Sequence, residues 1–98
     1  MPLTTQDWHQ RFIQQARWTS PLREYIFQHT QLLDAQRILE VGSGTGVIIS
    51  ALQSELSSDQ TNLLFGLDIN GSYLRFARGL SPDIILTQAN GHHLPYAD

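Results

Sequence analysis

The sequence contains no cysteine, and this absence removes several kinds of chemistry at once. A chain without thiols forms no disulfide bond, no thiolate zinc site and no cysteine nucleophile. The lack of cysteine fits a reducing compartment, and the N-terminus carries neither the basic nor the apolar part of a signal peptide. We therefore expect a cytoplasmic protein whose chemistry depends on other residue types.

Long apolar runs and an excess of basic charge are also missing. No apolar stretch approaches the ~18–20 residues that a membrane-spanning helix requires, so we expect no membrane partner. Six Lys and Arg residues against nine Asp and Glu residues give a formal net charge of -3. No basic block is present that could neutralise several phosphates of a duplex, so we expect no nucleic-acid partner.

What the chain does contain is typical of one folded domain of 98 residues, with 41% hydrophobic and 15% charged residues. Thr4 and Asp7 have the spacing of a capping box and predict a helix over 5–17. Ser20-Pro21 combines a capping hydroxyl with a proline at the first helical position, and predicts a second helix over 21–33. The apolar residues expected on one face of this second helix are Leu22, Tyr25, Ile26 and Leu33.

Short apolar runs alternate with helical patterns in the rest of the chain. The apolar runs predict strands over 38–41, 63–67 and 84–86. The segments between them are a helix beginning at Val47, a polar connection over 57–62 and a helix ending at Gly79. Strands that are apolar on both faces and alternate with helices predict a parallel sheet covered on both sides, which is the α/β doubly wound class.

A cluster of three glycines follows the first predicted strand, in the sequence Gly42-Ser43-Gly44-Thr45-Gly46. A glycine-rich turn between a strand and a helix is expected to place backbone N–H groups around a ligand, because residues without a Cβ allow close approach. The dinucleotide fingerprint G-x-G-x-x-G requires its third glycine at Val47. The spacing found here, E-x-G-x-G-x-G beginning at Glu40, argues against a nicotinamide cofactor.

This pattern resembles motif I of the class I S-adenosylmethionine-dependent methyltransferases. Gly66-Leu67-Asp68-Ile69-Asn70 is similar to the acidic second motif of that family, which implies that Asp68 accepts hydrogen bonds from ribose hydroxyls. Residues 89–98 are similar to the family's stretch D-A-x-x-L-P-F-x-D, with Asn90 at the position that meets the adenine amino group. Residues 14–19 loosely resemble the segment that lies across the cofactor. The cofactor-binding residues implied by the resemblance are Glu40, Gly42, Ser43, Gly44, Gly46, Asp68, Ile69, Asn90, Gly91 and Trp18.

The resemblance also implies a Rossmann-like architecture. A complete methyltransferase sheet has seven strands in the order 3-2-1-4-5-7-6, and this chain supplies the first three, in the order 3-2-1. We therefore expect the cofactor-binding part of a longer protein. Helices over 1–36 are expected to cover the site, and 37–98 form the first part of the S-adenosylmethionine-binding domain. The 98 residues alone are expected to be inactive, with the first strand at an open edge.

The implied function is transfer of a methyl group from S-adenosylmethionine to a small-molecule acceptor. The sequence identifies no catalytic residue and no oligomeric state. His92-His93 is not expected to bind a metal, because adjacent side chains point apart and no further ligand completes a site. Asp68 could instead cap the following helix, and Glu40 could bind the backbone N–H groups of the turn, the amino group of the cofactor, or both.

Two other classes of function stay open at this point. One is a methyltransferase-like module without activity that binds a protein partner. The other is part of an NAD-dependent oxidoreductase, which the glycine spacing disfavours.

Overall fold

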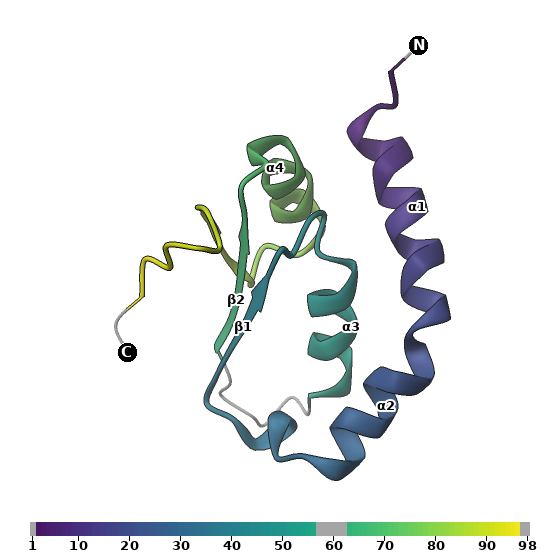
Figure 1. Ribbon diagram of the computed structural model, residues 1–98, viewed down its shortest axis with the longest axis vertical. Helices are drawn as coiled ribbons and strands as arrows, with labels where there is room; N and C mark the ends of the chain where they lie inside the picture. The colour runs from purple at the N-terminus through teal and green to yellow at the C-terminus, as the bar shows by residue number, and fades with distance from the viewer. Residues whose placement is uncertain (1, 57–62, 97–98) are drawn as a thin grey trace.

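Three parallel strands form the sheet of the computed structural model, which describes residues 2–56 and 63–96 (Figure 1). The strands are β1 (Arg37–Val41), β2 (Leu63–Asp68) and β3 (Ile85–Gln88), and β2 lies between the other two. Both pairs of neighbouring strands are parallel. The prediction of an α/β chain with a parallel sheet in this order is confirmed, and the polar connection predicted over 57–62 lies outside the described residues.

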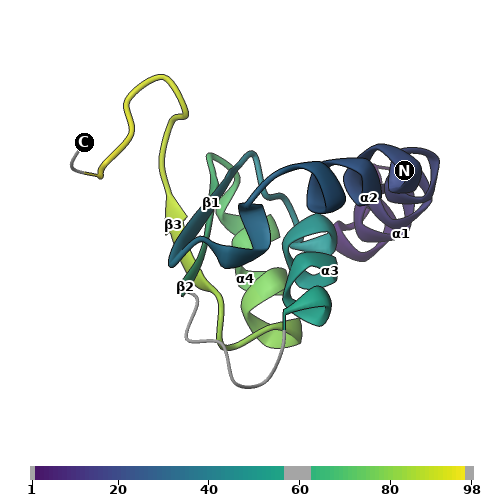
Figure 2. The same cartoon turned by 90° about the horizontal axis from the view of Figure 1, so that it is seen from below.

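The helices connect and flank these strands. They are α1 (Thr5–Trp18), α2 (Ser20–His29), the 3-10 turn η1 (Leu32–Asp34), α3 (Val47–Glu55) and α4 (Gly71–Leu80). Figure 2 shows α3 and α4 on the same side of the sheet, with α1 and α2 beyond α3. The chain moves in the same direction across the sheet from β1 to β2 and from β2 to β3. Because both crossover connections have the same handedness, α3 and α4 lie on the same face of the sheet. None of the described helices combines the length and the apolar character needed to cross a bilayer.

The opposite face of the sheet carries no helix within the described residues, so the expectation of a sheet covered on both sides is wrong for this part of the chain. The segment after β3 lies on that side (Figure 2). Its Tyr96 ring packs edge to face on Phe65, with 5.9 Å between ring centroids, and the Tyr96 hydroxyl donates to Thr87 Oγ1 at 3.3 Å. β1 pairs only with β2, so its other edge is open in this part of the chain, as expected.

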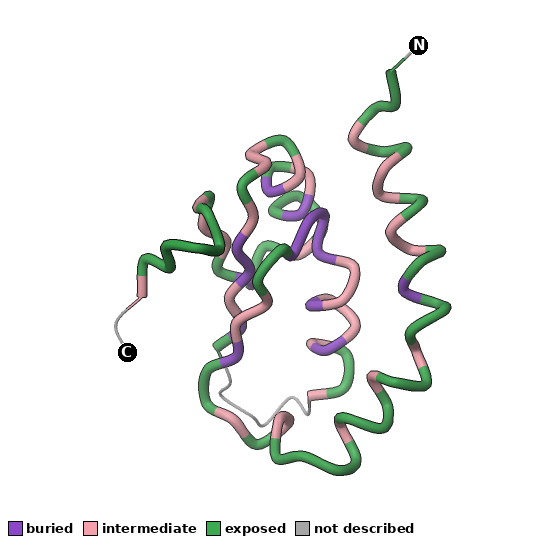
Figure 3. The backbone as a smooth tube through the Cα atoms, in the orientation of Figure 1, coloured by how far each residue is buried: buried purple, intermediate pink, exposed green. Residues whose placement is uncertain are grey.

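The core lies between the sheet and the helices, where Figure 3 shows the buried residues concentrated. Ile38 of β1 and Leu64 of β2 pack against Ile49 and Leu52 of α3, and Ile84 completes the cluster just before β3. The two α3 residues are three positions apart and therefore lie on one face of the helix. Full burial of each such side chain contributes about 1.5–3 kcal/mol, so this cluster positions the carboxyl ends of the strands and the start of α3.

α1 begins with the predicted capping box. The Thr4 backbone N–H donates to the Asp7 carboxylate at 2.9 Å, and the Asp7 N–H donates to Thr4 Oγ1 at 3.1 Å. α2 differs from the prediction at its start, because Ser20 is its first residue rather than its cap. Thr19 occupies the cap position and makes no capping hydrogen bond through its side chain.

α2 also ends earlier than predicted, and its apolar face is not buried. Thr30 adopts an extended backbone and ends the helix after His29, so the helix predicted over 21–33 is divided into α2 and η1. Leu22 is 60% exposed and Tyr25 is 59% exposed. The reason is position: α2 packs mainly against α1 and η1.

Small boundary corrections apply at the other end of the chain. α4 continues through Gly79 to Leu80, so the predicted end at Gly79 is wrong by one residue. The Ser81 N–H donates to the Ala77 carbonyl at 2.8 Å and completes the last turn. β3 begins one residue later than predicted, because Ile84 belongs to the core without joining the strand ladder.

Candidate functional site

The glycine turn, defined as residues 42–46, links the end of β1 to the start of α3. Its three glycines have positive φ angles, 75° at Gly42, 56° at Gly44 and 89° at Gly46. A Cβ is strained in this left-handed region, so the path of the turn requires glycine at each position. The sequence pattern therefore reflects backbone geometry in addition to any contact with a ligand.

The N–H groups of the glycine turn are used inside the protein, which corrects the expectation that they surround a ligand. Gly42 and Ser43 both donate to the Leu67 carbonyl, at 2.7 and 2.9 Å, so the turn is attached to the end of β2. Gly46 donates to the Ser43 carbonyl at 2.9 Å. A phosphate-binding loop needs such N–H groups free to face an anion, so this turn is poorly suited to a pyrophosphate.

Asp68, at the end of β2, holds the glycine turn from the side. Its Oδ2 accepts the Gly44 N–H at 2.9 Å, and its Oδ1 accepts the Asn70 N–H at 2.8 Å. The capping role considered for Asp68 belongs to Asn70, whose Oδ1 accepts the N–H groups of Ser72 and Tyr73 at 3.0 and 3.2 Å. Each Asp68 oxygen keeps a further lone pair, so the carboxylate is able to accept hydrogen bonds from a ligand as well.

Two pockets open beside the glycine turn and share Gly42 and Asp68. The first, which we call the strand-end pocket, has a volume of about 400 Å³ and lies at the carboxyl ends of β1 and β2 and the segment after β3. The second, which we call the helix-side pocket, has a volume of about 360 Å³ and lies between the turn and α1. Open parallel sheets bind their ligands at this end of the strands, so the two pockets form the candidate site.

The structure brings most of the predicted cofactor-binding residues to these two pockets. The strand-end pocket is lined by Gly42, Asp68, Ile69, Asn90 and Gly91. Glu40, Gly42, Ser43, Gly44 and Asp68 line the helix-side pocket. Residues 42 and 68, which are 26 positions apart in the sequence, line both pockets, and we call the pockets joined because they share these two residues.

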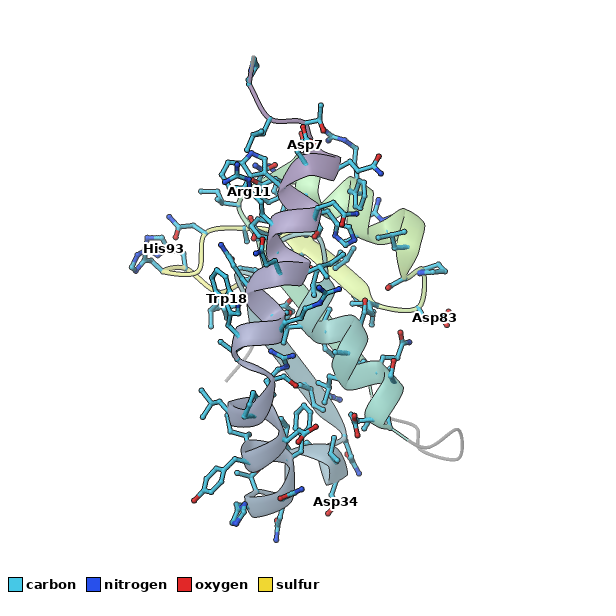
Figure 4. All side chains as sticks on the ribbon, turned by 90° about the vertical axis from the view of Figure 1, so that its right-hand side faces the viewer. Asp7, Arg11, Trp18, Asp34, Asp83 and His93 are labelled. Carbon is cyan, nitrogen blue, oxygen red and sulfur yellow. The ribbon has the colours of Figure 1, made fainter. Side chains whose placement is uncertain are left out.

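Gly46 and Trp18 line neither pocket. Gly46 precedes α3, and a Cβ added there would lie 3.4 Å from the Ala77 Cβ, so its role is close packing against α4. Trp18 is 72% exposed at the end of α1. In Figure 4 Trp18 and His93 lie to the same side of α1, with the Trp18 side chain pointing out from the helix. The predicted contact between Trp18 and a cofactor is therefore absent from the geometry of the two pockets.

The loop after β3 bounds the strand-end pocket. Asn90 Oδ1 accepts the His92 N–H at 2.9 Å, and the Asn90 carbonyl accepts the His93 N–H at 2.9 Å, so a local turn orients this side chain. A Cβ at Gly91 would lie only 2.9 Å from Val41 Cγ1, so glycine permits the loop to approach β1. Residues 2–56 and 63–96 contain no group of three or more His, Asp or Glu side chains that could hold a metal ion.

Glu40 lines the helix-side pocket from β1. Burial raises the pKa of its carboxyl from 4.5 to about 7; the Ile49 backbone N–H and the Arg23 guanidinium lower it, and the Asp68 carboxylate raises it further. Glu40 Oε1 is buried and has no hydrogen-bond partner among the described residues. The same is true of the Oγ of Ser43, a residue that is only 6% exposed. Buried polar atoms normally have partners, so these two oxygens mark a place for a ligand donor.

α1 closes the helix-side pocket through contacts with the glycine turn and α4. His9 Nδ1 lies 2.6 Å from Thr45 Oγ1 in the turn. The Phe12 ring packs edge to face on Tyr73 of α4, with 5.4 Å between centroids. A Cβ at Gly44 would lie 3.3 Å from the Phe12 ring, so the turn and α1 are in close contact.

Three of the residues that line the helix-side pocket beside α1 lie within the segment predicted over 14–19, and Phe12 lies outside it. Phe12, Gln15, Ala16 and Thr19 line the helix-side pocket, at the spacing i, i+3, i+4 and i+7 that places residues on one face of a helix. The resemblance over 14–19 selected the correct helix but the wrong side chain, Trp18. Residues spaced at the helical period from Phe12 mark the face of α1 that lines the pocket.

Comparisons of the chain with models of known protein families, with curated proteins and with solved structures found no match. The description of the protein therefore depends on its own geometry. Its helices and three-stranded parallel sheet are compatible with a Rossmann-like arrangement, with two joined pockets at the carboxyl ends of the strands.

Proposed function

We propose that this chain binds S-adenosylmethionine and is the cofactor-binding part of a class I methyltransferase that acts on a small molecule. The observation that carries this proposal is the charge of the two joined pockets. Carboxylates of Glu40 and Asp68 line them, no Lys or Arg does, and the glycine N–H groups are already bonded. Such a site suits a ligand that carries positive charge, whereas the pyrophosphate of a dinucleotide would meet repulsion.

The strand-end pocket suits the nucleoside end of this ligand. Asp68 has lone pairs for the two ribose hydroxyls, and the Asn90 side-chain oxygen has a second lone pair for an exocyclic amine. Ile69 is 68% exposed and offers apolar surface beside both residues for one face of the base.

The helix-side pocket suits the amino acid end. Glu40 Oε1 and Ser43 Oγ are acceptors without partners, and an ammonium group would supply donors to both. α1 covers this pocket with Phe12 and Gln15, which limits the access of water. With the nucleoside in one pocket and the amino acid in the other, Gly42 and Asp68, which line both pockets, would hold the part of the ligand that links its two ends.

The bound cofactor would supply an electrophilic methyl group on a sulfonium. The residues of this chain would bind and orient the cofactor. In such a transfer, the gain in rate comes mostly from the proximity and alignment of the acceptor. We propose that the acceptor site and the remaining strands of a seven-stranded sheet add at the open edge of β1 and on the uncovered face of the sheet. The 98 residues alone are then expected to bind the cofactor without turning it over.

The test is isothermal titration of the chain with S-adenosylmethionine, S-adenosylhomocysteine and NAD. A matched pair of variants, Gly42→Ala and Gly46→Ala, locates the site, because both positions have a positive φ and so carry the same kind of backbone strain. Only Gly42 lines the two pockets, so its added methyl should lower affinity by roughly fivefold to more than a hundredfold, by analogy with overpacked sites at ~1–3 kcal/mol. Gly46→Ala should leave affinity unchanged, because its Cβ would lie outside both pockets, in ordinary contact at 3.4 Å from the Ala77 Cβ.

The proposal fails if NAD binds and neither sulfur nucleoside does. It also fails if Gly42→Ala and Gly46→Ala bind S-adenosylhomocysteine equally well, since the ligand would then lie elsewhere.

A further inference from the structure

Two asparagine residues of this chain are followed directly by glycine, in the pairs Asn70-Gly71 and Asn90-Gly91. In such a pair the backbone nitrogen of the glycine can attack the side-chain carbonyl carbon of the asparagine, because no Cβ on the glycine hinders the approach. The attack closes a five-membered succinimide ring. Ring closure requires rotation of the peptide between the two residues, so the surrounding backbone decides which pair reacts.

The first pair is held by the start of α4. Asn70 is the cap residue of this helix, and its Oδ1 accepts the N–H groups of Ser72 and Tyr73. Its backbone carbonyl accepts the Leu74 N–H at 3.3 Å, and Gly71 is the first residue of the helix. Rotation of this peptide would break both the cap and the first helical hydrogen bond, so the folded structure protects Asn70.

The second pair lies in the loop after β3, outside any helix or strand, and both of its residues are exposed. Figure 4 shows His93, two residues further on, at the outer margin of the molecule. The His92 N–H donates to Asn90 Oδ1 at 2.9 Å, which favours the negative charge that this oxygen gains during attack. Among the described residues, one backbone hydrogen bond spans the peptide after Asn90, from the His93 N–H to the Asn90 carbonyl at 2.9 Å. Rotation at Asn90 therefore breaks less structure than rotation at Asn70.

We propose that Asn90 is a site of spontaneous deamidation, which converts a side chain that lines the strand-end pocket from an amide into a carboxylate. The Gly91 nitrogen forms a bond to Asn90 Cγ, the bond from Cγ to Nδ2 breaks, and Nδ2 leaves as ammonia with the Gly91 proton. Water then opens the ring. Hydrolysis of the new bond at Cγ gives aspartate, whereas hydrolysis of the original peptide bond gives isoaspartate, in which the main chain runs through the former side chain.

Each product changes the strand-end pocket in its own way. Aspartate at position 90 adds a negative charge to a pocket that already contains Asp68. Isoaspartate lengthens the main chain by one carbon and moves the carboxylate. Gly91 has little room to move towards β1, because even a Cβ there would lie 2.9 Å from Val41 Cγ1, so isoaspartate displaces the loop outwards. The age of the molecule therefore sets the charge and the shape of this pocket.

The effect of deamidation on ligand binding rests on the proposed function, whereas the deamidation itself does not. An ionised acceptor forms a stronger hydrogen bond with an amine donor than a neutral amide oxygen does. The aspartate form should therefore bind S-adenosylhomocysteine roughly fivefold more tightly than the unmodified chain. The isoaspartate form should bind it more weakly, because the displaced loop no longer bounds the pocket.

The test is incubation of the full chain at pH 8, followed by tryptic peptide mapping. Trypsin cleaves after Arg37, Arg75 and Arg78, so peptides 38–75 and 79–98 report on the two pairs separately. Deamidation adds about 1 Da and one negative charge, and fragment spectra locate it in each peptide. In the folded chain we expect Asn90 to react at least about tenfold faster than Asn70, which reacts only after local opening of α4. In urea, where no helix protects Asn70, the two rates should become similar.

Three variants supply the reference points. Asn90→Gln keeps the amide but would have to close a less favourable six-membered ring, so it should stay unmodified over the same time. Asn90→Asp reproduces one product and gives its affinity for S-adenosylhomocysteine by titration calorimetry. Asn70→Asp is the matched control, because it adds the same charge outside both pockets and aspartate also caps helices, so the affinity should not change.

The outcomes separate this inference from the proposed function. Equal rates at Asn70 and Asn90 in the folded chain would refute it, as would an Asn90 that stays intact in the folded chain while it reacts in urea. If Asn90 deamidates as expected but neither form binds S-adenosylhomocysteine, the modification site stands and the proposed function fails. If the unmodified chain and Asn90→Asp bind this ligand equally well, the function stands and the effect assigned to the new carboxylate is wrong.

Discussion

Asp68 connects the glycine turn to α4, so its removal should destabilise the chain even without a ligand. The substitution Asp68→Ala deletes both carboxylate hydrogen bonds, 2.9 Å to the Gly44 N–H and 2.8 Å to the Asn70 N–H. A hydrogen bond to a charged group contributes about 1.5–3 kcal/mol. The two bonds share one partly buried acceptor group and do not add fully, so we expect a loss of about 2–4 kcal/mol in the free energy of unfolding.

The loss is large compared with the whole stability of such a domain. Small domains are stable by roughly 5–15 kcal/mol, so Asp68→Ala removes a substantial fraction. The substitution also removes a negative charge that repels the ionised Glu40 carboxylate. At pH values where Glu40 is ionised, this relief offsets a small part of the lost free energy of unfolding. Cofactor affinity should fall in addition, because the junction of the two pockets loses its acceptor.

Urea unfolding followed by circular dichroism measures the effect directly. Asp68→Asn keeps one acceptor oxygen and should lie between the unmodified chain and Asp68→Ala. Asp83→Ala removes an exposed carboxylate after α4 and should change the free energy of unfolding by less than about 0.5 kcal/mol. Equal stabilities of Asp68→Ala and Asp83→Ala would refute the view that this side chain holds the turn.

Three further predictions follow from the same contacts. Burial raises the pKa of Glu40 from 4.5 to about 7, so the folded chain holds a proton that the unfolded chain releases, and stability decreases as pH rises through this window. At ~1.4 kcal/mol per pH unit, this loss in the free energy of unfolding approaches about 3 kcal/mol. Measured by urea unfolding, the stability of Glu40→Gln relative to the unmodified chain should therefore increase as the pH rises from 5 to 8. A difference in stability between the two proteins that stays constant over this range would contradict the prediction. Gly66→Ala should lose about 1–3 kcal/mol in thermal melts, because the added Cβ would lie 2.9 Å from both Leu86 Cδ2 and Ser43 Oγ; an unchanged melt would show that the site relaxes. Burial lowers the pKa of His9, so acidification below its ordinary value of 6.5 should loosen α1, seen as lower amide protection factors in that helix after correction for the intrinsic exchange rate at each pH, and equal protection factors at pH 5 and 8 would disprove it.

Features that depend on neighbours in the sequence were predictable from the residues alone. The capping box of Thr4 and Asp7 needs only three residues of spacing, and it forms as expected. The three glycines predicted a tight turn between a strand and a helix, and each has a positive φ. Apolar strands alternating with helices predicted a parallel sheet, because such strands have to be buried against connecting helices. Each of these follows from local backbone chemistry or from the period of the apolar residues.

Features that depend on which elements meet in space needed the tertiary structure. Asp68 and Gly44 are 24 positions apart, so their hydrogen bond follows from the pairing of β1 with β2. The exposure of Trp18 depends on how α1 lies over the glycine turn.

The burial of Glu40 could likewise not be predicted from its sequence position before the glycines, because it depends on α1 and α3 packing over the end of β1. That packing raises the pKa of Glu40 and leaves its Oε1 without a partner. The sequence by itself determined the cap of α1, the position of the glycine turn and the alternation of strands with helices. Only the tertiary structure decided which carboxylates face the pockets and which N–H groups are already bonded, because hydrogen bonding and desolvation are set by atoms distant in the sequence.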